Sequence, residues 1–85
     1  MIRAGILVVK ETGQKTTIQG EEHRYVRCVL ADETNPERRF ECRVLDVDDV
    51  DVNIGEPIQL QVQKVVTDRR SGVVRFDCTL LPTGE

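Results

Sequence analysis

The sequence predicts an all-β fold of five short strands that form one domain over residues 1–85. Apolar and polar side chains alternate with a period of two along most of the chain, which is typical of strands, and the 3.6-residue period of helices is nearly absent. Gly, Pro, Asn and Asp residues separate the alternating segments and indicate turns. The length of 85 residues is that of one small domain, whose core can be a single layer of apolar side chains.

The predicted strands cover residues 2–10, 23–32, 38–45, 57–66 and 73–81. The first is rich in β-branched and other apolar residues, and Gly5 within it indicates a bulge or a close approach of another backbone. Residues 11–22 are polar and contain Gly13 and Gly20, so they predict either a long hairpin loop or two ragged strand ends. The second strand follows this segment and alternates again.

The third strand begins after a turn, because the Asn-Pro pair at residues 35–36 disfavours both helix and strand. Its Phe40, Cys42 and Val44 share one side. Residues 46–55 then predict a crossing loop with at most one helical turn, since Asp, Val and Asn are poor helix formers.

The fourth strand places apolar and polar residues on opposite sides. The apolar side holds Ile58, Leu60 and Val62, and the polar side holds Gln59, Gln61 and Gln63. Residues 67–72 predict a hairpin loop. The fifth strand is expected to point four residues inward, namely Val74, Phe76, Cys78 and Leu80. Residues 81–85 are expected to form a tail.

Five short strands in a chain of this size expose unpaired edges if they lie flat, and curling into a barrel removes those edges. The five-stranded Greek-key barrel, or OB fold, accounts for the strand count and for the long connection between the third and fourth strands. We therefore expect a single OB-like domain, with an SH3-like barrel as the competing topology.

Cys28, Cys42 and Cys78 are predicted to be small buried residues of the core. Their odd number and the absence of a Cys-x-x-Cys spacing argue against a disulfide framework. A zinc site with His23 is not favoured, because zinc prefers paired, closely spaced ligands. We expect neither a metal nor another cofactor.

The charge is unevenly distributed along the chain. Twelve basic and fifteen acidic residues give a net charge of −3, yet five of the acids and no base lie in residues 46–56, so the rest of the chain carries +2. Calcium-binding EF-hand spacing fails in the frames that start at Asp46 and at Asp49, which predicts a solvated loop with its valines against the barrel. No phosphate loop, GxSxG or HExxH motif is present, and we expect no enzyme.

Basic residues on the loops and on one strand face predict contact with an anionic strand. Arg27, Arg43 and Arg75 fall on the side opposite the expected core, and Tyr25 is the candidate for stacking on a base. The predicted nucleic-acid-binding residues are Lys15, Arg24, Tyr25, Arg27, Arg38, Arg39, Arg69 and Arg70. The alternative is an ordinary charged surface with cross-strand ion pairs such as Glu41 with an arginine.

Several segments carry a resemblance to a known group. They are the Met-Ile-Arg start, Gly-Glu-Glu-His-Arg-Tyr at residues 20–25, Asn-Ile-Gly-Glu-Pro at 53–57, the basic hairpin, and the Leu-Leu-Pro that ends the last strand. The chain resembles the small single-stranded DNA-binding proteins of filamentous phages and related mobile elements, and minimal bacterial OB-fold proteins of the replication-restart type. The resemblance implies cooperative, sequence-tolerant binding by a homodimer or larger assembly. It also implies stacking by Tyr25 and phosphate contacts by Lys15, Arg24, Arg69 and Arg70.

The sequence thus predicts binding of single-stranded DNA or RNA through a basic face. The alternative function is a protein–protein assembly module, which the uncharged row of glutamines favours. The longest apolar stretch, residues 6–9, is far shorter than a membrane span, and the N-terminus lacks the pattern of a signal peptide. We expect a cytoplasmic protein with no membrane partner.

Overall fold

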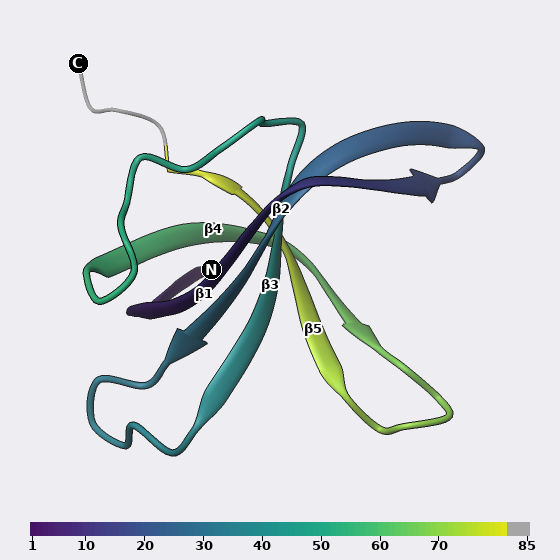
Figure 1. Cartoon of the computed structure of the whole chain (residues 1–85). Helices are drawn as coiled ribbons and strands as arrows, with labels where there is room; N and C mark the ends of the chain where they lie inside the picture. The colour runs from purple at the N-terminus through teal and green to yellow at the C-terminus, as the bar shows by residue number, and fades with distance from the viewer. Residues whose placement is uncertain (82–85) are drawn as a thin grey trace.

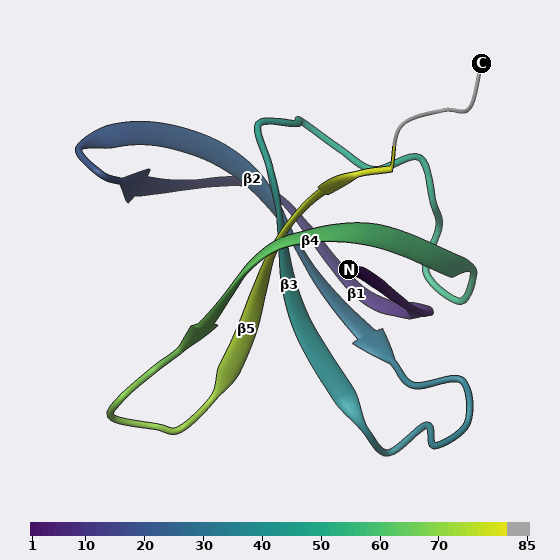
Figure 2. The same ribbon diagram turned by 180° about the vertical axis from the view of Figure 1, so that it is seen from behind.

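A computed structural model describes residues 1–81 and contains five strands and no helix within them (Figures 1 and 2). The strands are β1 (Ile2–Ile18), β2 (Glu21–Ala31), β3 (Arg39–Leu45), β4 (Pro57–Thr67) and β5 (Val74–Leu80). The all-β class and the five strands are therefore confirmed. The tail predicted for residues 81–85 lies, from residue 82 onward, outside the described residues.

The five strands form one sheet in the order β1-β2-β3-β5-β4, and every strand pairs with two others. β1 pairs with both β2 and β4, in antiparallel fashion. β3 and β5 pair in parallel, with Glu41 opposite Arg75 and Val44 opposite Cys78. Because β1 and β3 are both antiparallel to β2, the first residues of β1, β3 and β5 lie toward the same end of the sheet.

The segment predicted as a loop or as two strand ends is a pair of strand ends, with a register shift between Glu11 and Gln14. The pairing of β1 with β2 continues to Ile18 opposite Glu21. Gln19 and Gly20 connect them with φ angles of 51° and 81°, and two positive φ angles characterise the tightest hairpin turns. The resulting arm extends to one side of the molecule in Figure 1.

Gly5 is a point of close approach, as the sequence predicts. A Cβ atom there would lie 2.7 Å from the backbone oxygen of Ala31 and 3.1 Å from the Cβ of Leu30. Next to it, Ile6 pairs with Ala31 on β2 and with Pro57 on β4. The missing side chain therefore lets β1 pass from one neighbour to the other.

The core lies between the inward sides of the strands. Its buried residues are Leu7, Val26, Cys28, Leu30, Cys42, Val44, Val50, Ile58, Leu60, Val62, Phe76 and Cys78. All three cysteines are buried and unpaired, as predicted. Val74 and Leu80 are 44% and 45% exposed, so their predicted inward burial is wrong. Both lie beyond the short stretch in which β5 pairs with β3, so each has a partner only on β4.

Residues 46–56 cover one end of the core. Val50 is 2% exposed, and Val47 and Val52 pack against the same cluster. The Lys10 ammonium holds the segment by donating to the carbonyl oxygens of Val50 and Val52 at 3.3 and 3.1 Å. The segment contains no helical turn, whereas the prediction of a loop with its valines against the sheet is confirmed.

Candidate nucleic-acid interface

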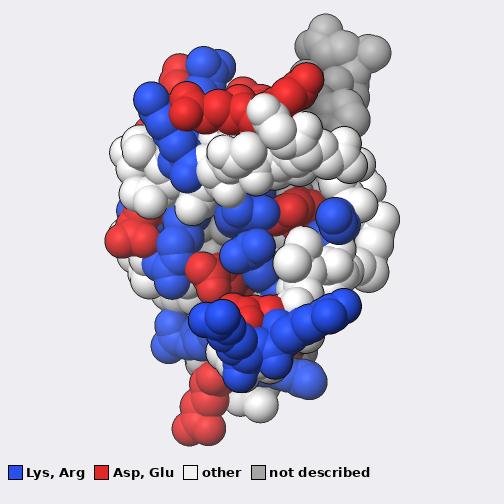
Figure 3. Space-filling view, turned by 90° about the vertical axis from the view of Figure 1, so that its right-hand side faces the viewer, with Lys and Arg blue, Asp and Glu red and all other residues white. Residues whose placement is uncertain are grey.

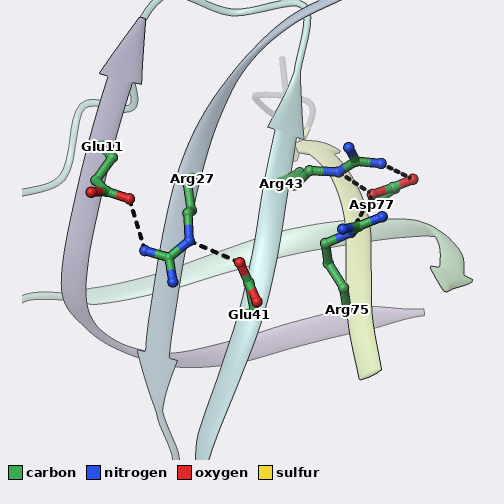
Figure 4. Close-up of polar contacts among 6 residues, drawn as sticks. All are labelled: Glu11, Arg27, Glu41, Arg43, Arg75 and Asp77. Carbon is green, nitrogen blue, oxygen red and sulfur yellow. Dashed lines mark hydrogen bonds and ion pairs between the residues drawn. The ribbon is translucent and has the colours of Figure 1, made fainter. Parts of the chain in front are cut away.

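The outer side of β2, β3 and β5 carries a row of paired charges (Figure 4). Arg27 lies between Glu11 and Glu41 and is one third exposed. Its Nε donates to Glu41 at 2.8 Å and its Nη1 donates to Glu11 at 2.8 Å. Chiefly because of the bond to Glu41, the pKa of Arg27 is raised above its usual value. The predicted alternative of a cross-strand pair with Glu41 is therefore confirmed for this arginine.

A second pair on the same side is buried. Arg43 donates through Nε and Nη2 to the two oxygens of Asp77, at 2.9 and 3.1 Å. The side chains of Arg43 and Asp77 are 11% and 7% exposed. Arg43 also donates through Nη1 to the hydroxyl of Thr16 at 3.1 Å, so the pair fastens the β1–β2 arm to β3 and β5. The sequence placed Arg43 on the outer side but carried no signal of this burial.

Tyr25 lies half-buried beside this buried pair. The guanidinium carbon of Arg43 lies 5.3 Å from the centre of its ring, which is within the range of a cation–π contact. One contact of the ring is thus internal to the protein, and stacking of Tyr25 on a base remains a prediction.

Lys15 and Arg24 also have acidic partners. Lys15 lies 3.9 Å from Glu22 across the β1–β2 arm, and the Nε of Arg24 lies 3.1 Å from Asp48. All four side chains are well exposed, so these ion pairs are weak and open to exchange with other anions.

Four predicted residues form no ion pair within residues 1–81, in contrast to Lys15, Arg24 and Arg27. They are Arg38, Arg39, Arg69 and Arg70. Arg38 ends the β2–β3 turn and Arg39 is the first residue of β3, whereas Arg69 and Arg70 belong to the β4–β5 hairpin. The turn and the hairpin both lie at the lower end of the molecule in Figures 1 and 2. We name these four residues the arginine end.

Two aspartates at the start of these connections, Asp32 and Asp68, bond to the backbone instead. Asp32 accepts from the backbone N–H of Thr34 at 2.9 Å, and Asp68 accepts from that of Arg70 at 2.8 Å. These amides are the main reason that the pKa values of both carboxyl groups are lowered. Asp32 and Asp68 are therefore engaged by backbone amides, while the four arginines are exposed. The Nε of Arg39 donates to the carbonyl oxygen of Pro36 at 3.1 Å.

Figure 3 shows how acidic and basic side chains are distributed over the face that lies on the right in Figure 1. Acidic atoms form a band at the top, basic and acidic atoms alternate across the middle, and basic atoms dominate the lower part. A cleft of about 350 Å³ lies beside the hairpin. It is lined by Glu41, Val66, Asp68, Ser71, Val73 and Arg75.

Sequence reasoning missed Arg3, which belongs to the same end. Its guanidinium carbon lies 3.7 Å from the ring centre of Phe40 and 4.9 Å from that of Phe76. Arg3 shares strand parity with Gly5 and Leu7, both buried. That alternation was the available signal that its side chain points inward.

Comparison with protein-family models, curated proteins and solved structures returned no match. Across residues 1–81, no three or more His, Cys, Asp or Glu side chains are placed to hold a metal ion together. The same residues include no helix with the length and apolarity needed to cross a bilayer.

Proposed function

We propose that the protein is an OB-type barrel that binds single-stranded DNA or RNA. Two features of the strand order support the fold. The sheet returns on itself through β1 and β4, and β3 and β5 are parallel neighbours, an arrangement that a simple antiparallel meander lacks. In OB folds the β2–β3 face and the loops β1–β2 and β4–β5 bind oligonucleotides, and the predicted contacts lie on these elements or on the adjoining β2–β3 turn.

The arginine end is the observation that carries the function. An arginine already held by a carboxylate must give up that partner before it can contact a phosphate. Arg38, Arg39, Arg69 and Arg70 have no such partner within the described residues. They can therefore bind phosphates at no cost in broken ion pairs, and the guanidinium group suits phosphate geometry through paired N–H donors.

Phosphate contacts of this kind are independent of base sequence and depend on salt, because each one releases counterions from the nucleic acid. We propose that Tyr25 adds stacking on one base. Since the chain offers few aromatic rings, affinity rests mainly on the arginines. Binding therefore depends little on the base sequence of the nucleic acid. We propose a homodimer or larger assembly as the binding form, and no catalytic role.

A second candidate function is assembly with another protein through the β4–β5 hairpin. Val65, Val73 and Val74 are 49%, 50% and 44% exposed there. Exposed valines at a hairpin can support strand pairing with a partner. Association through such apolar contacts would change little with salt, in contrast to phosphate binding.

The test is fluorescence anisotropy of labelled oligo-dT titrated with the protein at several salt concentrations, with a duplex of equal length as control. We expect tighter binding to the single strand, with a slope of about −0.7 in log affinity against log salt for each phosphate contact. The double variant Arg69→Ala/Arg70→Ala should reduce the magnitude of the slope by roughly 1.4. The matched variant Lys15→Ala/Arg24→Ala removes two basic side chains that form ion pairs with carboxylates. It should reduce the magnitude of the salt slope less.

Absence of binding at low salt would refute the proposal, because electrostatic attraction is strongest there. Equal effects of the two double variants would show that the ion pairs of Lys15 and Arg24 do not reduce their contribution to phosphate binding. A slope near zero with retained binding would instead favour the apolar hairpin as the contact.

A further inference from the structure

Arg3 is held in a fixed position against two aromatic rings. Phe40 and Phe76 meet edge to face, with ring centres 6.3 Å apart and planes at 67°. The guanidinium lies over the ring of Phe40 at 3.7 Å, well within the 6 Å range of a cation–π contact. Because the rings belong to the start of β3 and of β5, the side chain of Arg3 is ordered by the sheet itself.

The hydrogen-bonding capacity of Arg3 is unused. A guanidinium has five N–H donors and no acceptor. Within residues 1–81, Arg3 forms no ion pair and no side-chain hydrogen bond, and its Nε is buried without an acceptor. A buried donor without a partner is costly. One face of the group rests on a ring, so a partner can approach along its edge.

Arg3 lies at the same end of the sheet as the unpaired arginines. The first residues of β1, β3 and β5 share this end. Phe40, which contacts Arg3, directly follows Arg39 in sequence, and Phe76 directly follows Arg75. Along each of these strands, the ring faces inward to Arg3 while the neighbouring arginine faces outward.

We propose that Arg3 binds a phosphate group of the single strand, and that the strand passes over the arginine end rather than staying on the β2–β3 face. This inference rests on the proposed function and adds Arg3 to the residues that contact phosphates. The edge of a guanidinium offers two parallel N–H donors to one phosphate. Since the rings already fix the side chain, little conformational entropy is lost on binding.

The first test uses the wild-type protein and the ¹⁵N-labelled arginine Nε–Hε signals in an NMR spectrum. The Arg3 signal is identified as the one that disappears in Arg3→Lys, which retains a positive charge. Titration with oligo-dT should shift it, because a phosphate bound at the Nη groups would change the environment of the buried Nε–Hε in the same guanidinium. Inorganic phosphate is the second probe and should shift the same signal in the same direction at much higher concentration.

The second test compares the affinity for oligo-dT of Arg3→Gln with that of Lys15→Gln, an exposed base on the β1–β2 arm. Urea unfolding of each variant first establishes that it is folded. We expect Arg3→Gln to bind about tenfold more weakly at low salt, as for loss of one charged hydrogen bond. Its salt slope should be smaller in magnitude by roughly 0.7.

The outcomes separate the two proposals. If oligo-dT binds while the Arg3 signal and the slope of Arg3→Gln stay unchanged, the role of Arg3 is refuted and the proposed function stands. If oligo-dT does not bind the wild-type protein at low salt, both fail. A shifted Arg3 signal together with a reduced slope supports the path over the arginine end.

Discussion

The buried pair of Arg43 and Asp77 should be a main determinant of stability. Replacing Arg43 with Met retains much of the apolar contact of the side chain but leaves the carboxylate of Asp77 without its two hydrogen bonds of 2.9 and 3.1 Å. Arg75 cannot replace them in place, because its Nε is 3.9 Å from that carboxylate. Removing one partner of a buried pair costs about 3–5 kcal/mol.

That loss is large for a domain of this size. At about 0.05–0.15 kcal/mol per residue, 85 residues have an unfolding free energy of roughly 4–13 kcal/mol. Arg43→Met should therefore remove about a quarter or more of the total, and a variant near the lower limit would be partly unfolded at room temperature. Replacing both residues, as in Arg43→Met/Asp77→Leu, should cost less than Arg43→Met alone, since no charge is then left buried.

Urea unfolding followed by circular dichroism measures these differences, with the slope of the unfolding free energy against urea held as a check on two-state behaviour. Thr16→Val is the matched control, because it removes only the hydroxyl that Arg43 contacts at 3.1 Å and should cost about 1 kcal/mol. If Arg43→Met cost less than about 1 kcal/mol, or if the single losses simply added in the double variant, the pair would not be buried as described.

Three further predictions concern other parts of the chain. Gly5→Ala should cost about 1–3 kcal/mol in unfolding free energy, since its Cβ would meet a backbone oxygen at 2.7 Å. The control is Ala4→Ser, which adds one atom on the exposed side of the same strand and should leave urea unfolding nearly unchanged. Asp32→Asn should destabilise the protein at pH 7, because a neutral amide oxygen accepts the hydrogen bond from Thr34 more weakly than the carboxylate does. Because the pKa of Asp32 is lowered, the difference from wild type should shrink as pH falls from about 4 through the folded-state pKa; a difference independent of pH would contradict this. Burial raises the pKa of Cys28 to about 11, so a thiol reagent at pH 7.5 should modify it only after urea unfolding, and rapid reaction of the folded protein would refute its burial.

The strand positions follow from sequence because a pleated strand with one buried side imposes its alternation on the residues. This is why Phe40, Cys42 and Val44, and likewise Ile58 and Leu60, are inward as predicted. The alternation fails at Val74 and Leu80, because the pairing of β5 with β3 does not extend to them. The alternation of residues within one strand does not indicate how far a neighbouring strand extends.

The candidate site was less accessible to sequence reasoning, because charge state depends on partners distant in the chain. Arg27 and Arg69 are both arginines in or beside strands, yet only Arg27 lies between two carboxylates. The partners Glu11 and Glu41 are placed by strand register, which the sequence did not specify. Arg3 was missed because it lies in a segment interpreted as apolar, and its contacts come from two other strands.

The parallel pairing of β3 with β5 has a consequence for how the chain folds. Glu41 meets Arg75 and Val44 meets Cys78, so these contacts join parts of the chain separated by the whole of β4. Contacts between distant parts of a chain slow folding, and β-rich domains dominated by them fold in milliseconds to seconds. During synthesis β1, β2 and β3 can pair early, whereas the exposed edge of β3 must wait until β5 has left the ribosome. A strand edge that waits in this way is open to pairing with other chains, and the rate at which β5 arrives would govern the yield of folded protein.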